Sequence, residues 1–187
     1  MADSIFHEAQ ECYFNGDYDE ALRLCKIGIV QGRGKCMRLM GWIYYTGKCV
    51  ELDLEEALEW FSKAADLGDV EAVFGKGAVY YVWKQYSIAF NEFHVADDLG
   101  FVPAKVRLGM MIKVGLGVDK DLNRAYALYS QAAEEGNLIA ARLKVRMLLE
   151  GFEGLPGRIK AIPLLIKLAI KGYKVHLENP NDIKIMY

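Results

Sequence analysis

The stretch ALEWFSKAADLGDVEAVFGKG, residues 57–77, decides the fold of this chain because its pattern of small residues recurs along the sequence. Two series of small residues share spacings of 36, 32, 36 and 36 residues, namely Ala21, Ala57, Ala89, Ala125 and Ala161, and Gly32, Gly68, Gly100, Gly136 and Gly172. A helical repeat of this length cannot bury its apolar face alone, so neighbouring repeats must stack and share a core. The sequence therefore predicts an all-α solenoid.

Each repeat reads as two amphipathic helices joined by a turn. Apolar residues recur every three or four positions over 35–45 and again over 54–65, as packed helices require. Asp53 with Glu56 predicts a capping box at the start of the second helix, and Asp17 with Glu20 predicts the same one repeat earlier. Gly68 is expected to end a helix, with Asp69 capping the next.

Small residues also recur inside the first helix of each pair. Gly41, Gly77 and Gly109 share one repeat position, and a second position holds Cys36, Ala72, Ala104 and Ala140. A glycine inside a helix costs about 1 kcal/mol relative to alanine. Repeated use at that cost predicts close approach of neighbouring helices, which recovers the cost through packing.

The combined pattern resembles Sel1-like repeats, which are related to tetratricopeptide repeats. Residues 57–68 read A-x-x-W-F-x-K-A-A-x-x-G, and residues 115–121 form the glycine loop GLGVDKD. The resemblance implies a right-handed α-α superhelix forming a single α-solenoid domain over 1–187. Its units are expected at about 3–33, 34–68, 69–100, 101–136 and 137–172, followed by a cap or tail over 173–187. Pro163 is expected to delay or kink the last helix, because proline is tolerated only near a first turn.

Composition narrows the class of function. The net charge of −2 does not predict the basic surface that nucleic-acid binding requires. No apolar run is long enough to insert in a membrane. No signal peptide is recognised, which predicts a cytoplasmic protein, with secretion by a signal-independent route as the alternative. The four cysteines and three histidines lack metal-ligand spacing, and no catalytic or nucleotide-binding motif occurs. We therefore expect reduced thiols, no metal, no cofactor and no enzymatic activity.

The expected binding site is a concave groove lined by the first helices. Outward positions there fall three and four residues apart. They are aromatic towards the N-terminus and basic towards the C-terminus, which is typical of interface anchors. The candidates are Phe6, Tyr13, Arg38, Trp42, Tyr45, Phe74, Tyr81, Met110, Lys113, Arg142 and Arg146. The alternative is that these side chains pack against neighbouring repeats of the same chain.

The leading interpretation is a non-catalytic adaptor or scaffold that binds a peptide or protein segment. One alternative is an inhibitor or immunity protein that wraps a toxin or enzyme. Another is a structural homo-oligomer, such as a homodimer formed through the tail. Ile183, Ile185, Met186 and Tyr187 make that tail apolar, so it is expected to fold back on the last helix or to pair across a two-fold axis.

Overall fold

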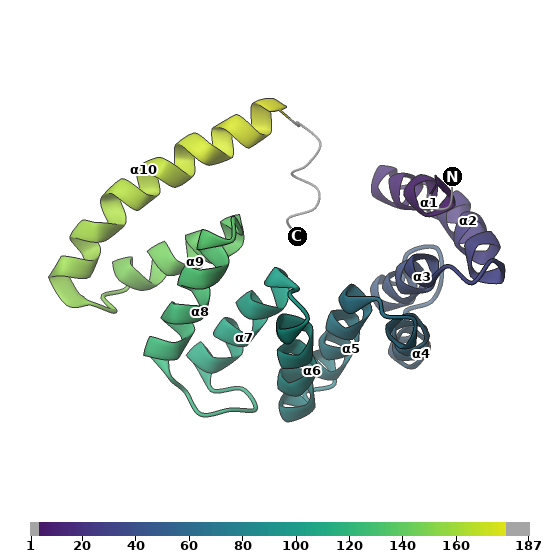
Figure 1. Ribbon diagram of the computed structural model, residues 1–187, viewed down its shortest axis with the longest axis horizontal. Coiled ribbons are helices and arrows are strands. Elements are labelled where there is room, and N and C mark those ends of the chain that lie inside the picture. Colours follow the sequence, from purple (N-terminus) through teal and green to yellow (C-terminus); the bar gives the residue numbers. More distant parts are fainter. Residues whose placement is uncertain (1–3, 179–187) are drawn as a thin grey trace. The chain divides into compact units, whose positions relative to one another are not determined.

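The computed structural model describes residues 4–178, with side chains described as far as residue 170, and this part of the chain is entirely helical apart from its turns (Figure 1). The helices over these residues are α1 (Ser4–Asn15), α2 (Tyr18–Val30), α3 (Gly34–Thr46), α4 (Leu54–Asp66), α5 (Val70–Val82), α6 (Tyr86–Asp98), α7 (Val102–Val114), α8 (Leu122–Glu134), α9 (Leu138–Leu149) and α10 (Gly154–Glu178). The predicted all-α class and its helix pairs are confirmed.

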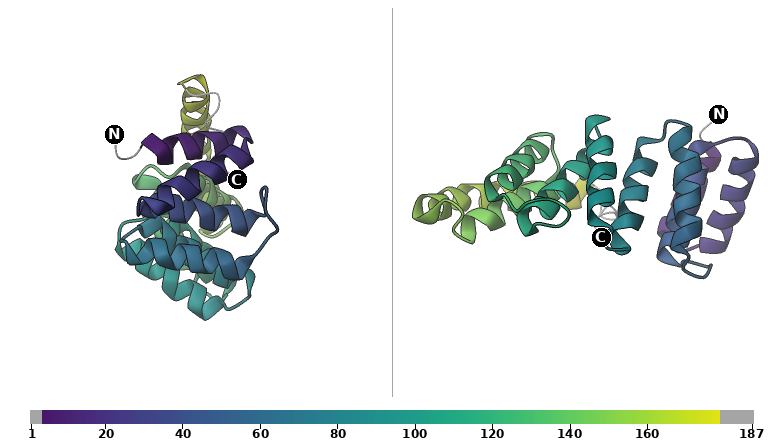
Figure 2. Two further views of the ribbon diagram at one scale, coloured as in Figure 1. Left: turned by 90° about the vertical axis from the view of Figure 1, so that its right-hand side faces the viewer. Right: turned by 90° about the horizontal axis from the view of Figure 1, so that it is seen from below.

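The chain divides into two compact units, Met1–Phe101 and Val102–Tyr187. The first holds α1 to α6 and the second holds α7 to α10. Within the first unit the helices lie side by side as roughly parallel rods, which the right-hand view of Figure 2 shows. The expectation of a single domain over 1–187 stays a prediction. The expected fold of the tail falls largely on 179–187, which lie outside the described residues.

The caps of α4 and α5 follow from local sequence. The Asp53 side chain accepts hydrogen bonds from the backbone N–H groups of Glu55 and Glu56, at 2.9 Å each. Gly68 follows α4 with a φ of +83°, a left-handed conformation that glycine adopts without strain. The Asp69 side chain then accepts the N–H of Ala72 at 3.1 Å. These predicted caps are confirmed.

The predicted capping box of Asp53 and Glu56 is wrong in its reciprocal half, and that of Asp17 and Glu20 is wrong in both halves. The carboxylate of Glu56 accepts a hydrogen bond from the Trp60 indole at 2.9 Å, while the backbone N–H of Asp53 donates to the carbonyl of Tyr44. Asp17 makes no side-chain cap at all. Glu20 pairs instead with Arg23 one turn further along its own helix. In both repeats the glutamate carboxylate therefore binds a side chain one turn further along its own helix, Trp60 for Glu56 and Arg23 for Glu20.

Small residues let the two helices of a pair cross closely, as predicted. A Cβ added to Gly41 would lie 2.7 Å from the Phe61 ring, and one added to Gly77 would lie 2.6 Å from the Phe93 ring. Gly109 stands in the same relation to Tyr129 at 2.6 Å. These rings are almost fully buried, and burial raises the pKa of the Tyr129 hydroxyl to about 12. Each glycine therefore makes the space that an aromatic ring of the second helix fills.

Gly77→Ala is expected to destabilise the protein by about 1–3 kcal/mol, because the added methyl group overlaps the Phe93 ring in a well-packed core. Urea unfolding followed by circular dichroism measures the change. Phe93→Leu in the same background should recover part of the loss, since the smaller side chain frees the space. An unchanged midpoint for Gly77→Ala would show that these helices do not need a glycine at their crossing.

The last helix departs from the expected start. α10 begins at Gly154 and contains Pro163 in its interior, so the alternative of a late start is wrong, while the alternative of a kink at Pro163 stays a prediction. Pro156 accounts for the early start, because proline favours the first turn of a helix, where its missing N–H costs nothing. At the glycine position of this pair stands Val145. The position matching Phe61 holds Leu165, which is 43% exposed, so the ring-on-glycine contact is absent from this pair.

Candidate partner-binding face of the first helices

The first unit presents one repeated aromatic position on its first helices. Tyr13, Tyr45 and Tyr81 each lie four residues after the glycine position of their helix, which holds Ala9 in α1. We call these three residues the tyrosine row. All three are partly buried and partly exposed. The helices α1, α3 and α5 therefore each carry one tyrosine at the same repeat position.

Contacts with neighbouring side chains hold the tyrosine row in place. The hydroxyl of Tyr13 lies 3.1 Å from Oγ1 of Thr46, a residue of the next repeat. The ring of Tyr13 meets that of Tyr18 edge-on, with centroids 5.5 Å apart, and Tyr81 meets Tyr86 in the same way at 5.4 Å. Fixed rings bind a partner with little further loss of side-chain entropy.

Trp42 joins the tyrosine row to the core. Its ring meets Tyr45 edge-on at 5.3 Å between centroids and meets the buried Phe61 at 4.9 Å. Like Tyr45, it is partly exposed. This side chain therefore has one edge in the packed interior and part of its surface free for contact.

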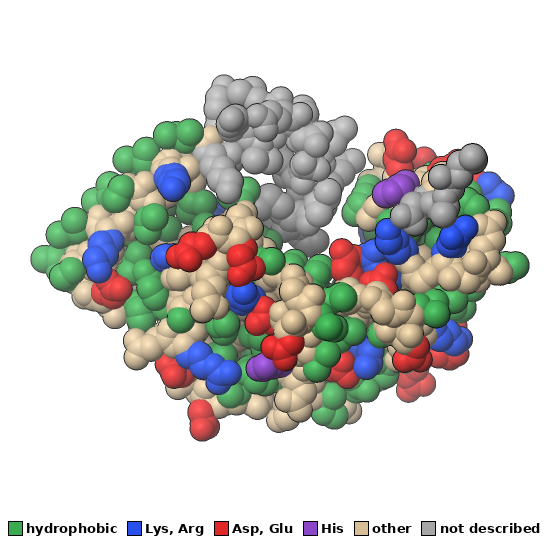
Figure 3. Space-filling model, viewed as in Figure 1, with side chains coloured by type: hydrophobic (Ala, Val, Ile, Leu, Met, Phe, Trp, Pro, Cys, Tyr) green, Lys and Arg blue, Asp and Glu red, His purple; other side chains and the backbone are tan. Residues whose placement is uncertain are grey.

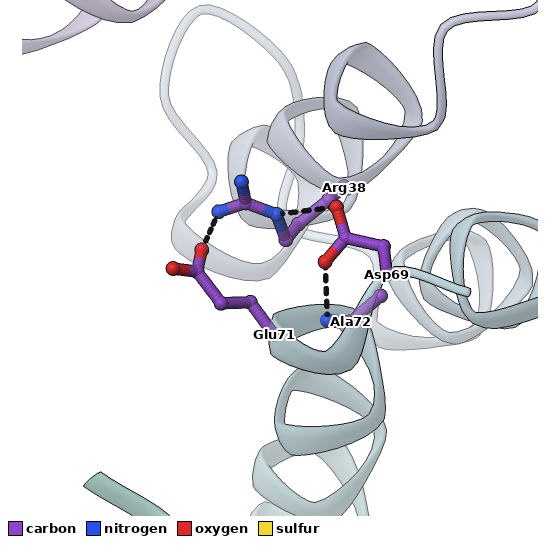
Figure 4. Close-up of polar contacts among 4 residues, drawn as sticks. All are labelled: Arg38, Asp69, Glu71 and Ala72. Carbon is purple, nitrogen blue, oxygen red and sulfur yellow. Dashed lines mark hydrogen bonds and ion pairs between the residues drawn. The ribbon is translucent and has the colours of Figure 1, made fainter. Parts of the chain in front are cut away.

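Arg38 is used within the protein. Its guanidinium Nε donates to Asp69 at 3.0 Å, and its NH1 donates to Glu71, so the side chain of α3 clamps the N-terminus of α5 (Figure 4). Only 11% of the Arg38 and Asp69 side chains is exposed. Asp69 at the same time caps α5 through Ala72. This geometry favours the self-packing alternative for Arg38.

Phe6 and Phe74 occupy the same repeat position as Arg38 and are also engaged internally. Phe6 is buried, and the Arg38 guanidinium lies 5.4 Å from its ring centre. Phe74 packs on Phe93 and on Phe101, with centroids 5.1 and 5.2 Å apart. Phe101 follows its cap glycine just as Asp69 follows Gly68. This repeat position therefore contacts the start of the next repeat, by an ion pair in one case and by rings in the other.

In the second unit the basic candidates lie on α7 and α9. Lys113 donates to Glu150 at 2.7 Å, and Arg146 lies 3.7 Å from the same carboxylate. The Lys113 hydrogen bond lowers the pKa of Glu150. Arg142 and Arg146 are exposed, and Met110 is partly buried against the local core. The two arginines are accessible, while Lys113 is held by an acidic neighbour.

A cavity lies among the described residues of each unit. The first, of ≈420 Å³, is lined by Phe6, Gly32, Arg33, Gly34, Lys35, Leu67, Gly68 and Asp69. The second, of ≈450 Å³, lies between α8, α9 and α10, and its lining includes Lys144, Leu164 and Leu168. Neither cavity includes a residue of the tyrosine row. In the described part of the chain, no three His, Cys, Asp or Glu side chains gather as a metal site would need.

The thiols differ in accessibility, which gives a simple chemical test. None of the four cysteines, which all lie among the described residues, is in a disulfide; Cys25 and Cys36 are fully buried and Cys49 is exposed. Burial raises the pKa of the Cys25 thiol to about 12. Maleimide at neutral pH should therefore modify Cys49 first and leave Cys25 unmodified until the protein unfolds, as mass spectrometry of the peptides will show. Equal labelling rates for the two would contradict this packing.

Tandem helix pairs that cross at small residues define an α-solenoid repeat protein. Residues 34–69 and 102–137 match the family model of the Sel1 repeat. These two stretches are therefore Sel1 repeats, and the resemblance seen in the sequence is confirmed. None of the described helices combines the length and the apolar character that crossing a membrane requires.

Solved structures support this assignment. The chain is similar to a Sel1 repeat protein from Oxalobacter formigenes, with 27% identity and a TM-score of 0.75 over 89% of this chain and 70% of that one. It is also similar to c5321, a protective antigen of uropathogenic Escherichia coli strains with an SLR fold. There the identity is 27% and the TM-score 0.68, over 96% of this chain and 41% of that one.

One curated relative matches over a shorter stretch. It is the ERAD-associated E3 ubiquitin-protein ligase component HRD3 of Candida glabrata, 26% identical over 92 residues. The match covers 49% of this chain but only 11% of that protein. Repeats of the Sel1 family typically mediate protein–protein interaction.

Proposed function

We propose that this protein is a non-catalytic adaptor that binds a peptide or protein segment along the tyrosine row of its first unit. The observation that carries the proposal is the recurrence of a partly exposed tyrosine at one position of α1, α3 and α5. Tyrosine combines a large apolar ring with a hydroxyl that both donates and accepts hydrogen bonds. A row of such residues suits a segment that offers apolar side chains and backbone polar groups together.

The neighbouring residues divide into two groups. Trp42 lies beside Tyr45 and adds a tryptophan, a residue type that is enriched at the hot spots of protein interfaces. Phe6, Arg38 and Phe74 are instead engaged within the protein, Phe6 in the core cluster against which Tyr13 packs and the other two at the start of the next repeat. The proposed contact set in the first unit is therefore Tyr13, Trp42, Tyr45 and Tyr81, and the exposed Arg142 and Arg146 of the second unit are candidates for separate, charged contacts.

The choice of a protein partner has two supports. The Sel1 repeats belong to an interaction family, and a net charge of −2 does not favour a polyanion such as nucleic acid. An inhibitor that wraps a toxin or enzyme would use the same row, so only the identity of the partner separates it from an adaptor.

Affinity purification from the native cell, with the intact chain as bait, tests this function. The expected result is a protein partner that binds the purified chain directly in a two-component assay. Phe74 and Arg38 variants would report mainly on folding, so binding should be compared between the wild-type chain and Trp42→Ala. If every recovered protein binds Trp42→Ala and wild type equally, the proposed face is wrong.

A further inference from the structure

The outer face of α10 carries a continuous row of exposed apolar side chains. Leu155, Ile159, Ile162, Ile166 and Ile170 are each between 57% and 71% exposed, and we call them the α10 stripe. Hydrophobic side chains interspersed with Lys and Arg cover the left-hand edge of the molecule in Figure 3, where Figure 1 places α10. An apolar row of this length is unusual on an uncovered surface.

The α10 stripe is not the face that holds α10 to its own unit. Ala161 is fully buried, and Leu164 and Leu168 pack beside it against Val145 and Leu148 of α9. By helical register the stripe lies on the opposite side of α10 from Ala161, Leu164 and Leu168. The helix therefore has two apolar faces, of which one is used by the fold.

Other second helices of the same chain show what an ordinary outer face contains. The repeat positions of Ile159, Ile166 and Ile170 are polar in both α4 and α8, where they hold Glu55, Ser62 and Asp66, and Asn123, Ser130 and Glu134. The stacking of repeats therefore does not require an apolar residue at these positions. Their replacement by isoleucine in α10 needs an explanation outside the solenoid core.

The spacing of the α10 stripe fits a helix as its occupant. From Leu155 to Ile166 the residues are separated by four, three and four positions, the alternation that forms a seam between two packed helices. Isoleucine occupies three of these four positions and leucine the first, and both are usual core residues of coiled coils. A second helix lying along α10 would bury all of these side chains together.

The charges beside the α10 stripe select among helices. Arg158 and Lys167 are exposed, and Lys160 is exposed and paired with Glu153 at 2.6 Å. Residues 154–170 contain no Asp or Glu. Two copies of α10 would therefore oppose positive charge to positive charge, which is destabilising. A helix with Glu or Asp beside its own apolar seam would pair favourably.

We propose that the α10 stripe binds an amphipathic helix of a partner protein whose apolar seam is flanked by acidic residues. This surface lies in the second unit and is independent of the tyrosine row. The proposal therefore goes beyond the adaptor function, and each can fail without the other.

Two synthetic helical peptides test the proposal on the intact chain. Both carry the same Leu and Ile seam over three heptads; one has Glu at the flanking positions and the other has Lys. Fluorescence anisotropy in about 100 mM salt should show binding of the Glu peptide and at least tenfold weaker binding of the Lys peptide. Ile159→Ser with Ile166→Ser should weaken the Glu peptide at least tenfold.

A matched pair of substitutions controls for surface apolarity in general. Ile88 and Val95 of α6 are 45% and 48% exposed and stand seven residues apart, as do Ile159 and Ile166. Ile88→Ser with Val95→Ser should leave peptide binding unchanged. Arg158→Glu with Lys167→Glu should reverse the preference, so that the Lys peptide binds more tightly than the Glu peptide. Circular dichroism confirms that each variant is folded.

Several outcomes would overturn the proposal. One is the absence of Glu-peptide binding, and another is equal binding by the Ile159→Ser, Ile166→Ser variant. A dimer in light scattering that this variant converts to a monomer would assign the α10 stripe to a second copy. Stripe-dependent binding to anionic vesicles without peptide binding would assign it to a membrane. Peptide binding seen only after deletion of residues 179–187 would assign it to the protein's own tail.

Discussion

Replacing Tyr45 and Tyr81 together by alanine is expected to weaken partner binding by about 100-fold or more. Truncation of an aromatic anchor at an interface commonly costs about 2 kcal/mol or more, and each 1.4 kcal/mol is a factor of ten. The two residues lie on α3 and α5, so one segment crossing the tyrosine row would lose contacts at two places. Isothermal titration calorimetry with the isolated partner measures the change in Kd.

Tyr80→Ala is the matched control for this pair. Tyr80 lies on the same helix as Tyr81, but its ring faces Trp83 rather than the tyrosine row, with centroids 5.8 Å apart. Its loss should alter stability and leave Kd nearly unchanged. Tyr45→Phe with Tyr81→Phe then separates the rings from the hydroxyls. A double alanine variant that is folded and binds as tightly as wild type would remove the tyrosine row from the binding site.

Phe61→Ala is expected to produce the largest loss of stability, about 3–5 kcal/mol, because it empties a ring-sized volume in a closed core. Phe61 is fully buried, and the added Cβ positions of Gly41 and Gly75 both fall within 2.7 Å of its ring. The Phe61 ring also packs against the ring of Trp42. Equilibrium unfolding in urea, followed by circular dichroism, measures the loss.

The controls for Phe61→Ala bracket this effect. Val30→Ala removes apolar atoms from a side chain that is 89% exposed, so its unfolding midpoint should hardly move. Phe61→Leu should lose less than Phe61→Ala, because part of the volume remains filled. Repeat arrays can unfold in stages, so hydrogen exchange of α3 to α5 locates the loss. A Phe61→Ala variant as stable as Val30→Ala would contradict the packing described for this pair of helices.

The sequence was sufficient for the helix pairs because their determinants are local and repeated. Spacing of apolar residues marks each helix, and Gly68 and Asp69 mark an end and a start that the structure confirms. The small positions Gly41, Gly77 and Gly109 predicted close crossings that the structure also confirms. Each of these features depends on residues within one repeat, so no knowledge of long-range contacts was needed.

The partners and exposure of individual side chains were harder to predict than the helices. The role of Arg38 depends on Asp69 and Glu71 of the next helix pair, and sequence spacing alone does not tell a clamp from a solvent-facing arginine. Glu56 was expected to close a capping box, but Trp60 one turn later binds it instead. The α10 stripe was also missed, although comparing Ile166 with the serines at its repeat position would have revealed it.

Photo-crosslinking from the tyrosine row tests the proposed binding site most directly. Benzoylphenylalanine is introduced at Tyr45 in one variant and at Glu59, an exposed residue of α4, in another. Irradiation with the partner present should give a covalent adduct from position 45 and none from position 59. An adduct from position 59 with none from position 45, in folded variants that both bind the partner, would show that the partner binds elsewhere.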